Sequence, residues 1–444
     1  MSWKVLADAG LVARVEPVLE AIYGVLEGSR WLPVGDLPPS RQPSLAGGLA
    51  GQALFCAYYG HARGRPDAEE TALALLEQSL VAAAEQPLAG GLYGGFSGVG
   101  WAVEHLAGRC YEAGEDATAD SEQEIVAFLE GGAADFPWEL IQGLSGLALY
   151  LLERPRPARP ALLRVVDALE ASARADERGL YWFTPAEWVP EPQREDSPAG
   201  QMNLGVAHGI TGVLGLLACL ELAGLGDPRL RHLSEGAVSW LLAHRLPAGG
   251  SSRVPAWIAV GREPEPTRTA WCYGDPGAAA VLSLAAAAFH RPDWQAEALE
   301  LGRLAARRPI SEVRALDAGL CHGSAGLCHL FNRLWQASGD AELETAAIAW
   351  LERTLALRVE GEGLAGFRTW EVRLDRPARW MSDPGFLTGI AGTGLALLAA
   401  TSELEPAWDR LLLASGPASA LRWRELEPPA LEAEPVLTLE EARP

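Results

Sequence analysis

The chain has few cysteines, no long apolar segment and no basic, apolar leader. Six cysteines among 444 residues are too few for a scaffold held by disulfides. The first residues, MSWKVLADAG, lack the basic and apolar regions of a secretory signal. No uninterrupted apolar run reaches the roughly 18 to 20 residues of a transmembrane helix. These absences predict a soluble, cytoplasmic protein with reduced thiols and no transmembrane segment.

Basic residues are also scarce relative to acidic ones. The sequence has 36 Lys and Arg against 58 Asp and Glu, which gives a net charge of -22. Nucleic acids and anionic membrane surfaces repel such a chain, so we expect no nucleic-acid partner. The hydrophobic content of 49% is ample for a large core.

A pair of glycines three residues apart recurs seven times, each time before an apolar run rich in Ala and Leu. The pairs are GLAG at Gly48, GFSG at Gly95, GLSG at Gly143, GITG at Gly209, GDPG at Gly274, GSAG at Gly323 and GIAG at Gly389. Glycine suits a helix start where backbones approach closely. Runs that are apolar all round indicate helices buried on most sides.

Segments of mixed polarity lie between the apolar runs. Their apolar residues have helical spacing, as in 68–84, 122–129, 161–173 and 341–357, which predicts amphipathic outer helices. Inner and outer helices alternating seven times predict an all-α fold, an α/α toroid with seven of each, as one domain over residues 1–402. We expect residues 403–444 to form an acidic, Pro-containing C-terminal segment that is partly disordered.

Three insertions lengthen the repeats near residues 180–202, 246–269 and 362–385. All three are rich in Trp, Pro and Arg and run directly into the start of an inner helix. They should therefore project over the face where the glycine turns gather. Long loops on one end of a rigid scaffold commonly carry a functional site.

Two neighbouring turns contain residues that can bind a metal. Cys272 stands two residues before Gly274, and Cys321 and His322 directly precede Gly323. Because the two cysteines share a phase of the repeat, we expect them at the same height on the toroid. Two thiolates and an imidazole form a three-ligand zinc site with one open position, as catalytic zinc sites have. The alternative, a Cys–His nucleophile and base, suits adjacent side chains less well, because these normally diverge.

Other turns place polar candidates on the same face. His208 directly precedes Gly209, and Glu139 lies four residues ahead of the glycine of its own turn. Arg268 and Tyr273 flank the first of the two metal-binding cysteines. The remaining four cysteines are interpreted as small buried hydrophobic residues.

The motifs GLYGGFSGVGW, NLGVAHGITG, RTAWCYGDPG, CHGSAG and GFLTGIAGTG follow one another in this order. Together they resemble the lanthipeptide cyclase family, often called LanC-like, over about residues 44–400. The resemblance implies an α/α toroid with one zinc ion bound by Cys272, Cys321 and His322. Further active-site positions of that family map onto the residues His208, Arg268 and Tyr273. The family commonly has an aspartate where this chain has Glu139, so the carboxylate is retained on a longer stem.

The resemblance implies an enzyme that adds cysteine thiols of a precursor peptide to its own dehydroalanine and dehydrobutyrine residues, forming lanthionine rings. His208 would then be the general acid and Arg268 would stabilise the enolate. Glu139 would orient His208, and Tyr273 would donate a hydrogen bond. The expected partners are a dehydrated precursor peptide with its leader segment and a separate lanthipeptide dehydratase, since no dehydratase region precedes the first repeat.

Three alternatives remain open from the sequence. A LanC-like enzyme could add a small thiol such as glutathione to dehydrated residues in proteins. A zinc-stabilised scaffold could bind peptides without turnover. An α/α-toroid glycosidase would need two carboxylates at the mouth of the toroid, and Glu139 and Asp275 are the candidates in the turns.

Overall fold

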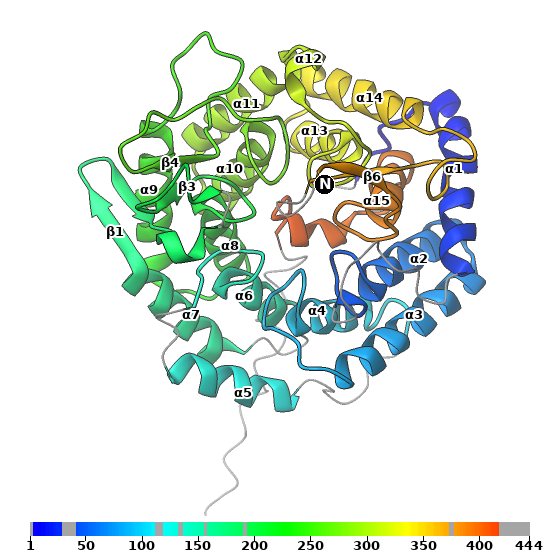
Figure 1. The fold of residues 1–444 in the computed structure, drawn as a ribbon, viewed down its shortest axis with the longest axis horizontal. Helices are drawn as coiled ribbons and strands as arrows, with labels where there is room; N and C mark the ends of the chain where they lie inside the picture. Colours follow the sequence, from blue (N-terminus) through cyan, green and yellow to red (C-terminus); the bar gives the residue numbers. More distant parts are fainter. Residues whose placement is uncertain are drawn as a thin grey trace, which may run out of the picture.

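The helices form two concentric rings around a central axis (Figure 1). This architecture comes from a computed structural model, which describes residues 3–28, 41–111, 119–131, 136–154, 158–189, 193–372 and 377–416. Within the described residues, no helix is both long enough and apolar enough to span a bilayer.

Seven helices of the described chain form the inner ring, and each begins directly after the first glycine of a repeated pair, as predicted. They are α2 (Leu49–Arg63), α4 (Phe96–Leu106), α6 (Leu144–Glu153), α8 (Ile210–Leu222), α10 (Asp275–Phe289), α13 (Ser324–Ser338) and α15 (Ile390–Thr401). Almost every side chain of α8 and α15 is buried, which explains their apolar sequences.

Seven further described helices form the outer ring. They are α1 (Ala9–Glu27), α3 (Pro66–Ala84), α5 (Ala119–Glu130), α7 (Arg159–Ser172), α9 (Pro228–Ala243), α11 (Pro292–Arg307) and α14 (Ala341–Ala356). The four outer helices named from the sequence are present, and α1 is a further one that precedes the first glycine pair. It packs against α15 and α2 and so closes the ring. The α/α toroid is confirmed.

Both glycines of a pair are required by close backbone approaches. A Cβ on Gly323 would lie 2.3 Å from the backbone nitrogen of Gly319, and one on Gly326 would lie 1.9 Å from the carbonyl oxygen of Leu320. Any side chain at either position would therefore push the turn away from the helix that follows it. Each repeated pair thus marks a turn that folds back over the start of the following helix.

Backbone hydrogen bonds join the seven turns into a circle. We call the seven residues two positions before the first glycine the turn ring: Ala46, Tyr93, Ile141, Ala207, Cys272, Cys321 and Leu387. At six of the seven steps, the N–H of one residue donates to the carbonyl oxygen of the next, over 2.9 to 3.4 Å. At the seventh step, the N–H of Ile141 donates instead to the Glu139 carboxylate.

The insertions supply short antiparallel strands. Around the first two lie the hairpin of β1 (Ala173–Asp176) and β2 (Gly179–Trp182) and the pair of β3 (Gln201–Asn203) and β4 (Trp257–Ala259); the third holds β5 (Thr369–Glu371) and β6 (Arg379–Met381). Pairing of β3 with β4 joins the first insertion to the second. In the third insertion, the Thr369 hydroxyl donates to the carbonyl oxygen of Thr388 in the last turn. Asn203 of β3 likewise contacts a turn, through its hydrogen bond to Tyr273.

The chain contributes to the core beyond residue 402, where the sequence placed the end of the domain. The 3-10 helix Ala407–Leu412 lies inside the ring (Figure 1), and its Trp408 is 1% exposed. The carbonyl oxygen of Leu412 accepts a hydrogen bond from the indole of Trp271 at 2.8 Å. The core therefore continues to residue 413, because the buried Trp and Leu side chains of residues 408–413 fill the ring. Residues 417–444 lie outside the described residues.

A buried ion pair attaches this segment to the inner ring. Arg410 donates to both oxygens of Glu153 on α6 at 2.9 and 3.0 Å, and both side chains are almost fully buried. We expect Arg410→Ala to lower the free energy of unfolding by about 3 kcal/mol, because the buried Glu153 carboxylate then keeps only its hydrogen bond with His105 and loses its cation. Chemical denaturation measures this change. The surface variant Arg65→Ala is the control and should cost less than about 1 kcal/mol; equal losses in both variants would contradict the argument.

Candidate metal centre and active site

The three candidate metal ligands named from the sequence lie close together in the structure. The Sγ atoms of Cys272 and Cys321 and a ring nitrogen of His322 all lie within 4.8 Å of one another. The turn ring causes this approach, because the N–H of Cys272 donates to the carbonyl oxygen of Cys321. A tetrahedral zinc ion with bonds of about 2.0 to 2.3 Å keeps its ligand atoms roughly 3.5 Å apart. The spacing and the soft donor set therefore fit zinc.

The electrostatics of the cluster favour a thiolate. The pKa of the Cys272 thiol is lowered well below its usual value by a hydrogen bond with Cys321, against the effect of burial, and with help from His322 and the Arg268 charge. Burial opposes a charge on His322, but its hydrogen bond with Cys272 outweighs burial and raises its pKa. The cluster therefore favours the thiolate form of Cys272, which is the form of cysteine that binds a metal ion.

A carboxylate–histidine pair closes the remaining step of the turn ring. The Glu139 carboxylate accepts hydrogen bonds from the backbone N–H groups of Ile141, at 3.2 Å, and Gln142, at 2.6 Å. The same carboxylate is hydrogen-bonded to Nδ1 of His208. With Nδ1 held in this way, Nε2 is the nitrogen that can exchange a proton with a substrate. The longer Glu stem therefore still reaches the histidine.

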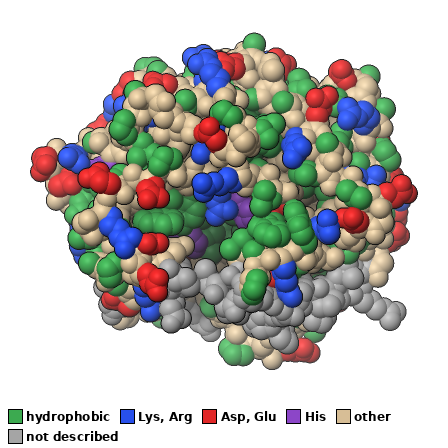
Figure 2. Space-filling model, turned by 45° about the horizontal axis from the view of Figure 1, so that its top comes forward, with side chains coloured by type: hydrophobic (Ala, Val, Ile, Leu, Met, Phe, Trp, Pro, Cys, Tyr) green, Lys and Arg blue, Asp and Glu red, His purple; other side chains and the backbone are tan. Residues whose placement is uncertain are grey.

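This pair also sets the charge of His208. Burial opposes protonation, but the hydrogen bond and the negative charge of Glu139 outweigh it and raise the pKa of His208. The histidine side chain remains 43% exposed, whereas that of Glu139 is 11% exposed. His208 thus presents a proton to an open space while its partner stays covered. Figure 2 shows histidine and basic side chains together in a hollow, with hydrophobic side chains around it.

Arg268 and Tyr273 complete the group named from the sequence. Arg268 is half-buried, and its charge lowers the pKa of Cys272. The phenol of Tyr273 accepts a hydrogen bond from Nδ2 of Asn203 at 3.3 Å, and its ring packs edge-to-face with that of Trp257 on β4. Burial raises the pKa of Tyr273, so its hydroxyl keeps its proton at neutral pH.

Sequence reasoning missed three side chains that shape the turns. Asn203, Asp317 and Asp383 each lie six residues before a first glycine, and each accepts the backbone N–H two residues further on, at 2.7 to 3.1 Å. Asn and Asp commonly close turns in this way. The sequence signal for them is the motifs NLG, DAG and DPG, which all stand at the same distance before a glycine pair.

Asp275 has a structural task instead of a place beside Glu139. Its carboxylate accepts the backbone N–H groups of Arg253 and Val254 at 2.8 to 3.1 Å and is 2% exposed. Burial raises its pKa to about 6. The carboxylate therefore anchors the second insertion to the start of α10, and the structure gives no support to a glycosidase pair with Glu139.

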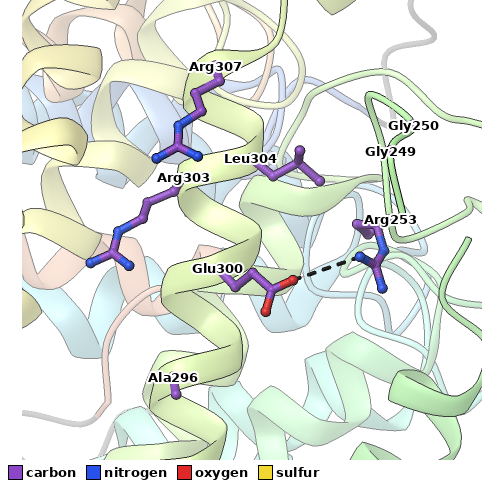
Figure 3. Close-up of a pocket in the computed structure, with 8 residues that line it drawn as sticks. All are labelled: Gly249, Gly250, Arg253, Ala296, Glu300, Arg303, Leu304 and Arg307. Atoms are coloured by element: carbon purple, nitrogen blue, oxygen red, sulfur yellow. Dashed lines mark ion pairs between the residues drawn. The ribbon is translucent and has the colours of Figure 1, made fainter. Parts of the chain in front are cut away.

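A cavity of about 550 Å³ lies away from the cluster, between the loop at Gly249 and α11 (Figure 3). It shares no residue with the candidate metal ligands. Arg303 and Arg307 line it, but they are paired with Asp340 and Glu342. Size alone does not make this cavity the functional site, because its charged groups already have partners.

Fold and site together define an α/α-toroid protein with two cysteines and a histidine as a potential metal-binding group at the mouth of the toroid. The family described as "Lanthionine synthetase C-like protein" matches residues 39–413, and the chain belongs to this family.

Individual relatives support the same placement. The chain is 25% identical over 273 residues to the nisin biosynthesis protein NisC of Lactococcus lactis subsp. lactis, across 56% of this chain and 63% of NisC. It is 27% identical over 137 residues to the glutathione S-transferase LANCL1 of Danio rerio, across 31% of each chain. The solved structure of a nisin cyclase superposes with a TM-score of 0.70 at 18% identity, over 92% of this chain and 98% of that one. The sequence matches thus span less than two thirds of either curated relative, and the structural match shows the fold.

Proposed function

We propose that the protein is a zinc-dependent lanthipeptide cyclase, which adds cysteine thiols of a dehydrated precursor peptide to dehydroalanine and dehydrobutyrine. The observation that carries this proposal is the cluster of Cys272, Cys321 and His322, with the Glu139–His208 pair at the neighbouring turn. Membership of the LanC-like family and the similarity to NisC support it.

Zinc held by the three residues would supply a Lewis acid that lowers the pKa of a thiol at its open position. The substrate thiol loses its proton to solvent, its sulfur forms a bond to the β-carbon, the C=C π bond breaks, and the π electron pair moves toward the carbonyl oxygen. The half-buried Arg268 would stabilise the negative charge that develops there, and Tyr273 would donate a hydrogen bond. His208 would then give the proton on Nε2 to the α-carbon, while Glu139 holds the ring by Nδ1.

The proposal extends to partners and location. We propose a precursor peptide with its leader segment as the substrate, a separate dehydratase that supplies the dehydrated residues, and a soluble, cytoplasmic enzyme. The three insertions are the proposed peptide contacts, because β3, β4 and β5 adjoin the turns that carry the site. Their Trp side chains suit recognition of an extended peptide.

Mass spectrometry of alkylated peptide tests the function directly. Ring closure within a peptide leaves its mass unchanged but removes one free thiol for each ring. We expect incubation of the zinc-loaded protein with a dehydrated precursor to reduce the number of thiols that an alkylating reagent can label. Unchanged labelling with a set of dehydrated precursors, despite bound zinc, would instead support a scaffold that binds peptides without turnover.

A second candidate function rests on the similarity to LANCL1, which is described as a glutathione S-transferase. The same site could add an external thiol to a dehydrated residue. Incubation with glutathione and a dehydrated peptide that lacks cysteine separates the two functions. Addition would raise the peptide mass by that of glutathione, whereas a dedicated cyclase leaves this peptide unmodified.

The pH dependence of the rate tests the link between Glu139 and His208. Glu139 raises the pKa of His208, so the histidine stays protonated above the ordinary value of about 6.5. The rate should fall as pH rises through that raised pKa. Glu139→Gln removes the charge and should move this fall to lower pH, so the loss of kcat/KM is larger at pH 8 than at pH 6.

Glu139→Asp is the matched variant, since it keeps the charge on a shorter stem. The pH at which its rate falls should be closer to that of the parent protein. An unshifted pH profile in Glu139→Gln would show that Glu139 does not set the protonation of the catalytic acid. The same pKa shift stabilises the fold: its contribution is complete below about pH 6.5 and is lost as pH rises through the raised pKa of His208.

A further inference from the structure

The side chain of Asn203 connects two turns next to the metal-binding group. Its Oδ1 accepts the backbone N–H of Gly205 at 3.0 Å, and its Nδ2 donates to the phenol oxygen of Tyr273 at 3.3 Å. Oδ1 is committed to an N–H group, which can only donate. The amide orientation is therefore fixed by the hydrogen bonds, and the group that faces Tyr273 must be the NH2.

Two other repeats show that the turn itself does not need an amide. Asp317 and Asp383 occupy the same position and accept the same N–H group through one carboxylate oxygen. Their second oxygens also accept hydrogen bonds, from the backbone N–H of Trp370 and from the hydroxyl of Thr388. A carboxylate closes this turn as well as an amide does. What distinguishes Asn203 is that its second polar atom donates.

Packing fixes the position of the Tyr273 ring beside the Asn203 amide. A Cβ on Gly205 would lie 2.5 Å from Cδ1 of Tyr273, so the ring packs directly on the glycine backbone. The ring of Trp257 on β4 packs against it edge-to-face, with ring centroids 6.0 Å apart. With the ring fixed and its oxygen accepting from Asn203, the hydroxyl proton is directed elsewhere. Tyr273 directly follows Cys272 in the chain.

We infer that Asn203 is a positioning residue that directs the hydroxyl proton of Tyr273 toward the substrate. The phenol then donates to the carbonyl oxygen of the dehydrated residue as negative charge develops there. This inference rests on the proposed cyclase function. It assigns no atom of Asn203 to the substrate, because its effect passes through Tyr273.

Asn203→Asp is the sharpest test, because the chain already uses Asp in this turn. The new carboxylate keeps the hydrogen bond from Gly205, but its second oxygen accepts the Tyr273 proton and turns the donor away from the substrate. We expect kcat to fall at least about tenfold, with KM, zinc content and the midpoint of thermal unfolding little changed. Asp383→Asn is the matched control in another turn and should keep the parent kcat, because the Thr388 hydroxyl can accept from the new amide.

A double-mutant cycle shows whether the effect passes through the phenol. Tyr273→Phe should lower kcat to a similar extent, and adding Asn203→Asp to it should cause no further loss. Equal losses from Asn203→Asp in both backgrounds, or an unchanged kcat in the parent background, would overturn the inference. A parent protein that forms no rings would refute the proposed function, which is a separate result.

The proton itself can be located without turnover. Neutron diffraction from a crystal of the deuterated parent protein should show the deuteron of Tyr273 pointing away from Asn203, and in Asn203→Asp pointing toward the new carboxylate. A deuteron directed at Asn203 in the parent protein would overturn the inference, whatever the activity of either protein.

Discussion

Replacing Cys321 by alanine should remove metal binding and ring formation together. The variant would leave Cys272 and His322 as two ligands, and a two-ligand site does not hold zinc as a three-ligand site does. Loss of the Lewis acid should cost several kcal/mol in the barrier, or about three orders of magnitude in rate. Elemental analysis gives the zinc content per chain, and thiol labelling of the dehydrated peptide gives the rate.

Cys328→Ala is the matched control for this prediction. Cys328 lies on α13, the helix that follows the Cys321 turn, and is as buried as the core around it, but it is not among the candidate metal ligands. We expect the control to keep zinc and activity with a small loss of stability. Full zinc content in Cys321→Ala would show that the metal centre lies elsewhere.

His208→Ala should separate chemistry from metal binding. The histidine is not among the three clustered ligands, so zinc content should stay at the parent level. Loss of a general acid typically costs about 10²- to 10⁴-fold in rate, and we expect kcat to fall in this range. A variant that also lost zinc would show that His208 supports the metal centre and would remove its assignment as a separate acid.

A surface histidine provides the comparison. His61 lies in the last turn of α2, at the other end of an inner helix from the glycine turns, and is exposed. His61→Ala should leave both zinc content and kcat unchanged. If His208→Ala formed rings as fast as His61→Ala does, another group would have to protonate the α-carbon.

The sequence predicted the parts of this protein that repeat. Seven glycine pairs marked seven inner helices, and the shared phase of Cys272 and Cys321 indicated that they lie at the same height on neighbouring turns. Glu139 and His208 could be placed on the same face by the same reasoning. Their direct contact depends on the turn ring, because the N–H of Ile141 donates to the Glu139 carboxylate and not to the next turn.

Features without a repeat could not be predicted in the same way. Helix α1 has no glycine pair before it, so nothing in the repeat marks it as an outer helix. Arg410 lies in a segment with many acidic and proline residues, and only tertiary contacts with Glu153 show that it is buried. The role of Asn203 depends on which of its two polar atoms faces Tyr273, and a sequence does not contain that orientation.

Closure of the circle gives the protein a mechanical property that an open array of repeats lacks. The end repeats of an open array have one neighbour each and can fray. Here the N–H groups of Leu6 and Ala7 donate to the carbonyl oxygen of Ala400, so the first described residues pack on α15 and none of the described repeats is terminal. Separating any one repeat from the circle breaks two interfaces at once, which favours all-or-none unfolding. The spacing between Cys272 and Cys321 is therefore maintained by all seven repeats of the closed ring.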